Sequence, residues 1–446
     1  MALGGHNQPA AARGHSLAIV LLFLLCSLPW FLSIPGVYIF DDYITPLSDP
    51  ASQGIGNFLE FFGLTLRPLT KLTYALEVAL GVDSVDFRRI FQITVHLLNT
   101  LVFFYILKRL YPEETGSPVL LLLAAVVYLI HPIQAEKVLA IAGRSTLLME
   151  GLVLGAVLAA ITRKFKVGIL LYIGSIFARE TAFFFLPLMT VVFMPAGRKD
   201  RLLLVTLVVI ALGALFSVPR YRALIDFSFA ARDVVASSIQ QIAAIPIGFS
   251  LYFAPWKLSI DHGEILTASI GNPWFIVGVF LYFLLFFFLL SGDHHRKLQV
   301  LWIVAALLPT QSCIPKLDAL TERPFALALP GCIMFLLQMS CCDAKKIYKN
   351  ILLCLLAIAV PALIFSASKR SLLYRDESAI WRDAMEKSRG NIRPYLNYAT
   401  LLIDKGRIDD ARAILLRADA INPFDADLAD KLRMMQYKKL LKDNDR

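Results

Sequence analysis

The first residues able to do acid–base chemistry are two adjacent carboxylates, Asp41 and Asp42. They stand in the sequence Phe40-Asp41-Asp42-Tyr43, directly after the first long apolar run. A carboxylate pair at a membrane surface can act as a general base or position a divalent metal ion. Acidic pairs in loops are also commonly solvated and without a chemical role. The pair therefore indicates a reaction site only in combination with other groups.

Four arginines follow between or at the ends of apolar runs: Arg67, Arg144, Arg179 and Arg323. A guanidinium group can bind two phosphate oxygens at once, so arginine suits phosphate recognition particularly well. Arg67, which precedes Pro68, could equally anchor a basic surface helix to anionic headgroups. Because acidic residues stand near all four arginines, the set predicts a binding site for a lipid-linked phosphate.

Seven more polar residues occur in the same kind of segment and are candidates for the site. They are His131, Glu136, Glu180, Lys257, Asp261, His262 and Glu322. Ionisable groups at or near membrane depth are costly and are usually functional. Any one of them could instead be a snorkelling side chain or part of a structural ion pair. For the whole set, a polar cavity is the better interpretation.

The composition indicates an integral membrane protein. Hydrophobic residues make up 57 % of the 446 residues and charged residues 17 %, and the mean hydropathy is +0.65. A soluble domain is about half apolar and about one quarter charged. The net charge of +10 is attributed to basic cytoplasmic loops, so no nucleic acid is expected as a partner.

Two other classes of site are not expected. The sequence has no GxGxxG or Walker loop, which argues against a nucleotide-binding domain. Its six cysteines form no CxxC motif and no paired spacing. We therefore predict neither a structural disulfide nor a zinc site, and no metal ligand is assigned.

Eleven apolar runs predict about eleven transmembrane helices. They lie near 17–34, 87–107, 118–131, 146–162, 167–178, 181–195, 202–218, 274–290, 298–310, 325–340 and 351–367. Several are shorter than the roughly 20 residues that a full span needs. Short helices with polar residues between them can enclose a cavity. The runs thus predict an all-α polytopic bundle with a site that opens to one side.

Compact basic clusters predict the orientation of the bundle. They are Lys108-Arg109, Arg163-Lys164 with Lys166, Arg198-Lys199 with Arg201, Arg296-Lys297, and Lys345-Lys346 with Lys349. All five fall on one side of the predicted bundle, which the positive-inside rule makes cytoplasmic. The N-terminus is then cytoplasmic. The segments 35–86, 131–145, 179–181, 219–273, 311–324 and 368–446 then face the periplasm or a lumen.

The last part of the chain, 369–446, is densely charged and amphipathic. The stretch Ile392–Pro423 has the pattern of one tetratricopeptide repeat, with Gly406 at its turn. A helix over 376–388 would complete a preceding repeat, and a helix over 426–441 would cap the array. We predict two domains: a membrane domain over 1–368 and an outward-facing helical tail over 369–446.

Taken in chain order, these segments resemble the transmembrane and tetratricopeptide-repeat protein O-mannosyltransferases and their bacterial relatives, within the GT-C class of membrane glycosyltransferases. The matching segments are Phe40-Asp41-Asp42, Arg67-Pro68-Leu69-Thr70 with Leu72-Thr73-Tyr74, Val95-His96-Leu97-Leu98-Asn99, His131-Pro132-Ile133-Gln134 with Glu136, Gly143-Arg144-Ser145, Arg179-Glu180-Thr181, Pro255-Trp256-Lys257-Leu258-Ser259-Ile260-Asp261, Glu322-Arg323 and the tail from near Trp381. The resemblance spans nearly the whole chain, and the ordered set is more specific than any single motif.

The resemblance implies a polyprenyl-phosphate hexose, such as mannose, as donor and a protein hydroxyl as acceptor. It implies that Asp41 acts as the base, with Asp42 beside it, and that Arg144, Arg179 and Arg323 are candidates for binding the donor phosphate. The chemistry is coherent, because cationic side chains stabilise the charge that develops on a phosphate leaving group. No further cofactor is assigned, and a requirement for a divalent metal is left open.

Two other functions remain open at this point. One is a GT-C enzyme that glycosylates a lipid or an envelope polymer; the other is a non-catalytic membrane scaffold that presents the repeats. Helical repeats most often bind peptides, which favours a protein acceptor docked by the tail. The array is shorter than in the animal members of the family. The expected location is therefore a bacterial inner membrane, with the active site and tail in the periplasm.

Overall fold

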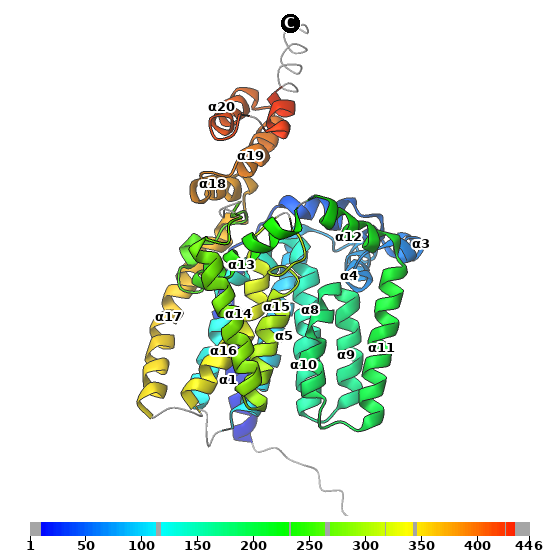
Figure 1. Ribbon diagram of the computed structural model, residues 1–446, viewed down its shortest axis with the longest axis vertical. Helices are drawn as coiled ribbons and strands as arrows, with labels where there is room; N and C mark the ends of the chain where they lie inside the picture. Colours follow the sequence, from blue (N-terminus) through cyan, green and yellow to red (C-terminus); the bar gives the residue numbers. More distant parts are fainter. Residues whose placement is uncertain are drawn as a thin grey trace, which may run out of the picture.

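The computed structural model describes residues 10–112, 117–231, 233–263, 268–316, 318–341, 346–423 and 425–432. Over these residues the regular structure is entirely helical, which confirms the predicted all-α class. Figure 1 shows an upright bundle of helices with a smaller helical tail that extends from one end.

Six long helices are apolar enough to cross a membrane, judged by length and composition. They are α5 (Val85–Leu110), α8 (Arg144–Ile161) with the turn before it, α11 (Arg198–Ser217), α14 (Pro273–Ser291), α16 (Glu322–Cys341) and α17 (Lys346–Leu373). A seventh span results if α6 (Pro118–Ile130) is joined to the helical residues Pro132–Leu139, which continue it after a bend of 44°. This bent segment carries two of the predicted site residues, His131 and Glu136.

The other predicted spans form helices shorter than a full span. They are α1 (Ala10–Cys26) with α2 (Leu28–Phe31), α9 (Phe165–Ala178), η7 (Glu180–Phe185) with α10 (Leu186–Val192), and α15 (His294–Leu307). All eleven predicted runs are thus helical, while six or seven are long enough to cross a membrane unaided. A further apolar helix, α13 (Val234–Ser250), lies in segment 219–273, which was predicted to lie on the outer face.

Local sequence determines where several helices begin. Ser84 accepts a hydrogen bond from the backbone N–H of Phe87 at the start of α5, and Asn272 accepts one from Trp274 at the start of α14. These side chains satisfy N–H groups that have no partner in the first turn of a helix. Glycine allows one close contact between helices. A Cβ at Gly278 of α14 would lie 2.2 Å from the carbonyl oxygen of Ile242 in α13, so a larger residue there would push the two helices apart.

The segments between spans gather at the end of the bundle from which the tail extends. Helices α3 (Ile55–Glu60), α4 (Pro68–Ala79) and α12 (Pro219–Ala231) lie there (Figure 1). In α4, Tyr74 donates a 2.6 Å hydrogen bond to the carbonyl of Ile141, and Thr70 donates one of 2.9 Å to that of Ala178. These bonds join the predicted outer segments 35–86 and 131–145 to each other, and join the first of them to the end of α9, directly before Arg179.

The opposite end of the bundle holds the starts of α11 and α17 (Figure 1). Both starts carry predicted basic clusters, although Lys345 lies outside the described residues. Two of the five predicted basic clusters therefore lie together at the end of the bundle away from the tail. The orientation of the bundle in a membrane stays a prediction.

The tail has three described helices and its own apolar core. They are α18 (Glu377–Lys387), α19 (Arg393–Asp404) and α20 (Ile408–Asp419), with Gly406 at φ +73° in the turn between α19 and α20. Ala399 and Leu415 are buried in that core. The predicted domain boundary at residue 368 falls inside α17, which continues to Leu373. The predicted cap helix is described only to residue 432.

Candidate active site

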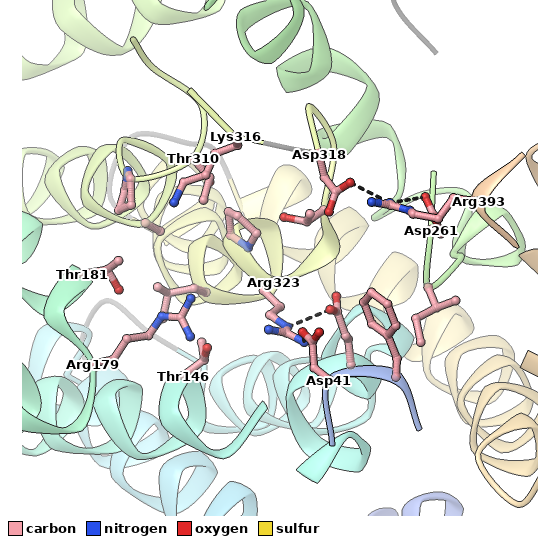
Figure 2. A pocket seen from close by; sticks show the side chains of 18 of the residues that line it. Asp41, Thr146, Arg179, Thr181, Asp261, Thr310, Lys316, Asp318, Arg323 and Arg393 are labelled. Carbon is pink, nitrogen blue, oxygen red and sulfur yellow. Dashed lines mark hydrogen bonds and ion pairs between the residues drawn. The ribbon is translucent and has the colours of Figure 1, made fainter. Parts of the chain in front are cut away.

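A cavity of about 210 Å³ lies where the bundle, its connecting segments and the tail meet. Its charged lining residues are Asp41, Glu136, Arg179, Asp261, Lys316, Asp318, Arg323 and Arg393. Figure 2 shows Arg179 and Lys316 toward one side of the cavity, Asp261, Asp318 and Arg393 toward the other, and Arg323 and Asp41 between them. Five of these eight residues belong to the set predicted from sequence.

The two adjacent aspartates have different environments. Asp42 is fully buried, where its carboxylate accepts hydrogen bonds from the backbone N–H groups of Ala142 (2.7 Å) and Ile39 (3.1 Å). Burial raises the pKa of Asp42 to about 6, although these N–H groups favour the charged form. The side chain of Asp41 is 41 % exposed and lines the cavity. Asp42 therefore holds the loop in place, and Asp41 is the carboxylate that a substrate can reach.

The backbone before Asp41 has an unusual conformation that the tail supports. Phe40 has φ +44°, a value that residues other than glycine rarely adopt. Its backbone N–H donates to the carboxylate of Glu377, and its ring packs edge-to-face on Trp381 with centroids 5.4 Å apart. Both partners belong to α18. The tail thus holds the turn that presents Asp41 to the cavity.

Arg323 lies between two acidic residues at the centre of the site. Its guanidinium forms an ion pair with Glu136 at 2.7 Å and a longer contact with Asp41 at 3.5 Å. Because the closer ion pair is the stronger one, Arg323 is engaged mainly by Glu136. Asp41 therefore keeps an oxygen that can accept a proton.

Two cations on the other side of the cavity have no carboxylate partner among the described residues. Arg179 donates a 2.9 Å hydrogen bond to the hydroxyl of Ser145, and the ammonium group of Lys316 makes no ion pair. Burial lowers the pKa of Lys316, and the positive charge of Arg179 lowers it further. Two neighbouring cations that form no ion pair within the described part of the chain make a site suited to an anion. The hydroxyls of Thr146, Thr181 and Thr310 line the same part of the cavity.

Two of the predicted phosphate-binding arginines lie outside the cavity lining. Arg67 makes a two-pronged ion pair with Glu180, with atoms 2.8 and 3.0 Å apart. Arg144 is fully buried, 2.7 Å from Glu77, with its guanidinium 4.1 Å from the ring centre of Tyr74. Both side chains join segments of the predicted outer face to one another.

The remaining predicted residues also lie outside the cavity lining. His131 donates through Nε2 to the carbonyl of Tyr252 at 3.1 Å, because its Nδ1 accepts from the backbone N–H of Ile133. His262 lies 3.1 Å from the buried carboxylate of Glu322. Lys257 is exposed and does not line the cavity.

Asp261 lines the cavity and is bound by the tail. Arg393, in the first turn of α19, donates to both oxygens of Asp261 at 2.5 and 2.6 Å and forms an ion pair with Asp318 at 2.6 Å. Lys387 of α18 also reaches the carbonyl of Leu258, close to this aspartate. The tail therefore supplies part of the cavity wall.

Sequence reasoning missed the three charged lining residues Lys316, Asp318 and Arg393, the indole of Trp381, and the threonines that line the cavity. Lys316 and Asp318 stand in the predicted outer segment 311–324 and could have been identified there as further polar residues between apolar runs. The positions of Trp381 and Arg393 depend on how the tail folds back on the bundle, which no local pattern indicates. Within the described residues, no group of three or more His, Cys, Asp or Glu side chains could hold a metal ion.

Comparison with known proteins gives two similarities. A tetratricopeptide-repeat model matches residues 379–434, which confirms the predicted repeat. A protein O-mannosyl-transferase from Caenorhabditis elegans is 26 % identical over 211 residues, a match that covers 42 % of this chain and 30 % of the relative. The matched region thus spans less than one third of that protein's length. No solved structure matches the chain.

Proposed function

We propose that this protein is a membrane glycosyltransferase of the GT-C type that transfers a hexose, such as mannose, from a polyprenyl phosphate to a protein hydroxyl. The observation that carries the proposal is one cavity that holds a reachable carboxylate, Asp41, and two cations, Arg179 and Lys316, that form no ion pair among the described residues. A sugar phosphate needs both kinds of group, a base for the incoming hydroxyl and positive charge for the departing phosphate. The similarity to a protein O-mannosyl-transferase supports the same class of reaction.

In the proposed reaction, the acceptor hydroxyl oxygen attacks C1 of the donor sugar. The bond between C1 and the phosphate oxygen breaks, and its electron pair leaves with the polyprenyl phosphate. Asp41 takes the hydroxyl proton as the new glycosidic bond forms. Arg323 keeps Glu136 engaged at 2.7 Å, which leaves Asp41 as the carboxylate for this transfer.

The donor phosphate is proposed to bind between Arg179 and Lys316. Arg179 and Lys316 are both half-buried and form no ion pair among the described residues, so a phosphate bound between them relieves their mutual repulsion. The threonine hydroxyls beside them can donate further hydrogen bonds to phosphate oxygens. The polyprenyl chain would lie among the apolar helices, and the site would face the periplasm or a lumen, as the basic clusters predict.

The proposal is tested with purified full-length protein in lipid nanodiscs. The protein is mixed with synthetic polyprenyl-phosphate mannose or glucose and with a peptide rich in serine and threonine. Mass spectrometry then reads any hexose added to the peptide. We expect Asp41→Asn to reduce the transfer rate by about a thousandfold, which is within the range for loss of a positioned base.

Asp83→Asn is the matched control, because Asp83 is an exposed aspartate at the same end of the bundle and is absent from the cavity lining. It should keep the activity of the unaltered protein. Full activity in Asp41→Asn would remove Asp41 from the role of base. If hexose appears on a lipid or an envelope polymer and never on peptide or protein, the acceptor class in the proposal is wrong.

A further inference from the structure

Apart from the cavity at its junction with the bundle, the tail has a groove of about 730 Å³ on its own surface. Helices α18, α19 and α20 form it. Its lining residues are Arg382, Met385, Glu386, Arg389, Tyr395, Tyr398, Ile414, Arg417, Ala420 and Ile421. The cavity that contains Asp41 shares none of these residues.

The groove carries an excess of positive charge. Three arginines line it, and Glu386 is the one acidic residue among the lining residues. Arg389 and Arg417 are exposed and have no carboxylate partner among the residues that the structure describes. Arg382 donates to the backbone carbonyl of Ser378 and forms an exposed ion pair with Asp376 at 3.6 Å, and such surface ion pairs contribute little. The groove therefore complements a ligand of negative charge.

The floor of the groove is aromatic and apolar. Tyr395, Tyr398 and Met385 are buried there, and the guanidinium of Arg417 lies 5.5 Å from the ring centre of Tyr395. Rigid aromatic surfaces beside arginine are typical of the central residues of protein interfaces. A groove with such a floor and a cationic rim suits an extended peptide whose acidic side chains reach the rim.

The groove and the cavity use different faces of the same two helices. In α18, Trp381 lines the cavity and the next residue, Arg382, lines the groove. In α19, Arg393 lines the cavity, and Tyr395 lines the groove. A chain held in the groove is therefore tethered within a short distance of the cavity, which raises its effective concentration there.

We propose that this groove binds an acidic, extended segment of the protein acceptor and so selects acceptors that carry acidic stretches near the modified hydroxyl. The inference rests on the proposed function for its link to catalysis. The binding itself depends only on the groove.

The test measures binding to the full-length protein in nanodiscs of zwitterionic lipid. The probes are a fluorescent peptide of about twelve residues, in which acidic residues flank serine and threonine, and its counterpart with Asn and Gln in place of Asp and Glu. We expect tighter binding of the acidic peptide and a loss of about tenfold in affinity in Arg389→Glu and in Arg417→Glu. Glu386→Lys should tighten binding, a gain that misfolding cannot imitate.

Arg412→Glu is the matched control, since Arg412 lies on α20 with Arg417 but outside the groove lining, and the change in charge is the same. Equal affinity for the two peptides, or an equal loss in Arg412→Glu, would overturn the inference. So would binding to anionic vesicles in place of the peptide. A third outcome is that the acidic peptide binds and that Arg389→Glu and Arg417→Glu weaken this binding, but that no sugar is transferred to any peptide. This result would support peptide binding in the groove and contradict the proposed function.

Discussion

Arg393 of the tail donates two hydrogen bonds, of 2.5 and 2.6 Å, to the carboxylate of Asp261 in the cavity wall. The side chain of Asp261 is 3 % exposed, and that of Arg393 is 35 % exposed. The charge of the buried Asp261 is therefore balanced by a partner, Arg393, that comes from the tail. This relationship makes the tail part of the cavity as well as an appendage of the bundle.

The first prediction concerns this contact. Arg393→Met should destabilise the protein by about 2 kcal/mol, because the change leaves the buried carboxylate of Asp261 without its charged donor. It should also raise KM for the acceptor more than for the donor, since Asp261 and Asp318 lie across the cavity from Arg179 and Lys316 (Figure 2). Thermal unfolding in detergent and two-substrate kinetics measure these effects.

Arg407→Met is the control for this contact. Arg407 forms an ion pair with Asp410 on the exposed surface of the tail, at 2.7 Å, where such pairs contribute at most about 1 kcal/mol. A loss of stability as large as that in Arg393→Met would show that the tail responds to any removed arginine. The double variant Arg393→Met with Asp261→Asn should recover part of the loss, because the buried charge is then also gone.

The second prediction follows from the buried carboxylate of Asp42. Its pKa is raised to about 6 in the folded protein, from about 3.9 in an unfolded chain. The unfolded state therefore loses this proton first as pH rises. The contribution of Asp42 to stability is complete below pH 4 and declines by about 2 to 3 kcal/mol as pH rises through 6.

Thermal unfolding between pH 4 and pH 7 measures this decline. Asp42→Asn has no ionisable group at this position, so its melting temperature should fall less over that range than that of the unaltered protein. Asp41→Asn keeps the buried carboxylate of Asp42, so its melting temperature should still show the decline that Asp42 causes. Parallel pH profiles for the unaltered protein and Asp42→Asn would contradict the assignment of Asp42 to a structural role.

The third prediction separates the donor site from the acceptor site. Lys316→Gln removes one of the two cations beside the proposed phosphate position that form no ion pair in the described ranges, while keeping a polar side chain of similar length. We expect KM for the polyprenyl-phosphate donor to rise by about tenfold, with KM for the peptide unchanged. Because the two cations repel one another in the free protein, the variant should be as stable as the unaltered protein or slightly more stable.

Lys257→Gln is the matched control for Lys316→Gln. Lys257 is exposed at the same end of the bundle and is absent from the cavity lining. An equal rise in donor KM in both variants would indicate long-range attraction of the anionic donor, with no contact at Lys316. A rise in peptide KM alone would place the acceptor, and not the donor, beside Lys316.

The sequence was most informative where a pattern is local. Apolar runs predict helices because hydrophobic periodicity and helix propensity act over neighbouring residues, and the repeat pattern from Ile392 predicts α19 and α20. Sequence order also indicated that the segments around Asp41, Arg179 and Arg323 belong at one end of the bundle. These conclusions needed no knowledge of which side chains meet.

Contacts between distant segments could not be predicted in this way. The family resemblance implied Asp41 as the base, but no local pattern distinguishes it from Asp42, since the difference arises from the backbone N–H of Ala142, 100 residues away. Similarly, Arg144 and Arg179 stand in comparable positions, yet only Arg144 meets a buried carboxylate, that of Glu77. Glu77 belongs to α4, so the packing of α4 on the neighbouring segments determines that Arg144, and not Arg179, forms the ion pair.

The last prediction uses that difference between two arginines. Arg144→Met should cost about 3 kcal/mol of stability, because it removes a charged partner of the buried Glu77 and a guanidinium packed over Tyr74. Arg179→Met should cost little stability, since it removes a cation that has no carboxylate partner, but it should raise donor KM as Lys316→Gln does. Thermal unfolding and donor kinetics on the same preparations compare the two. If Arg144→Met folds normally and loses donor affinity alone, Arg144 reaches the proposed donor phosphate as the family resemblance implied, and the ion pair with Glu77 does not persist when the donor binds.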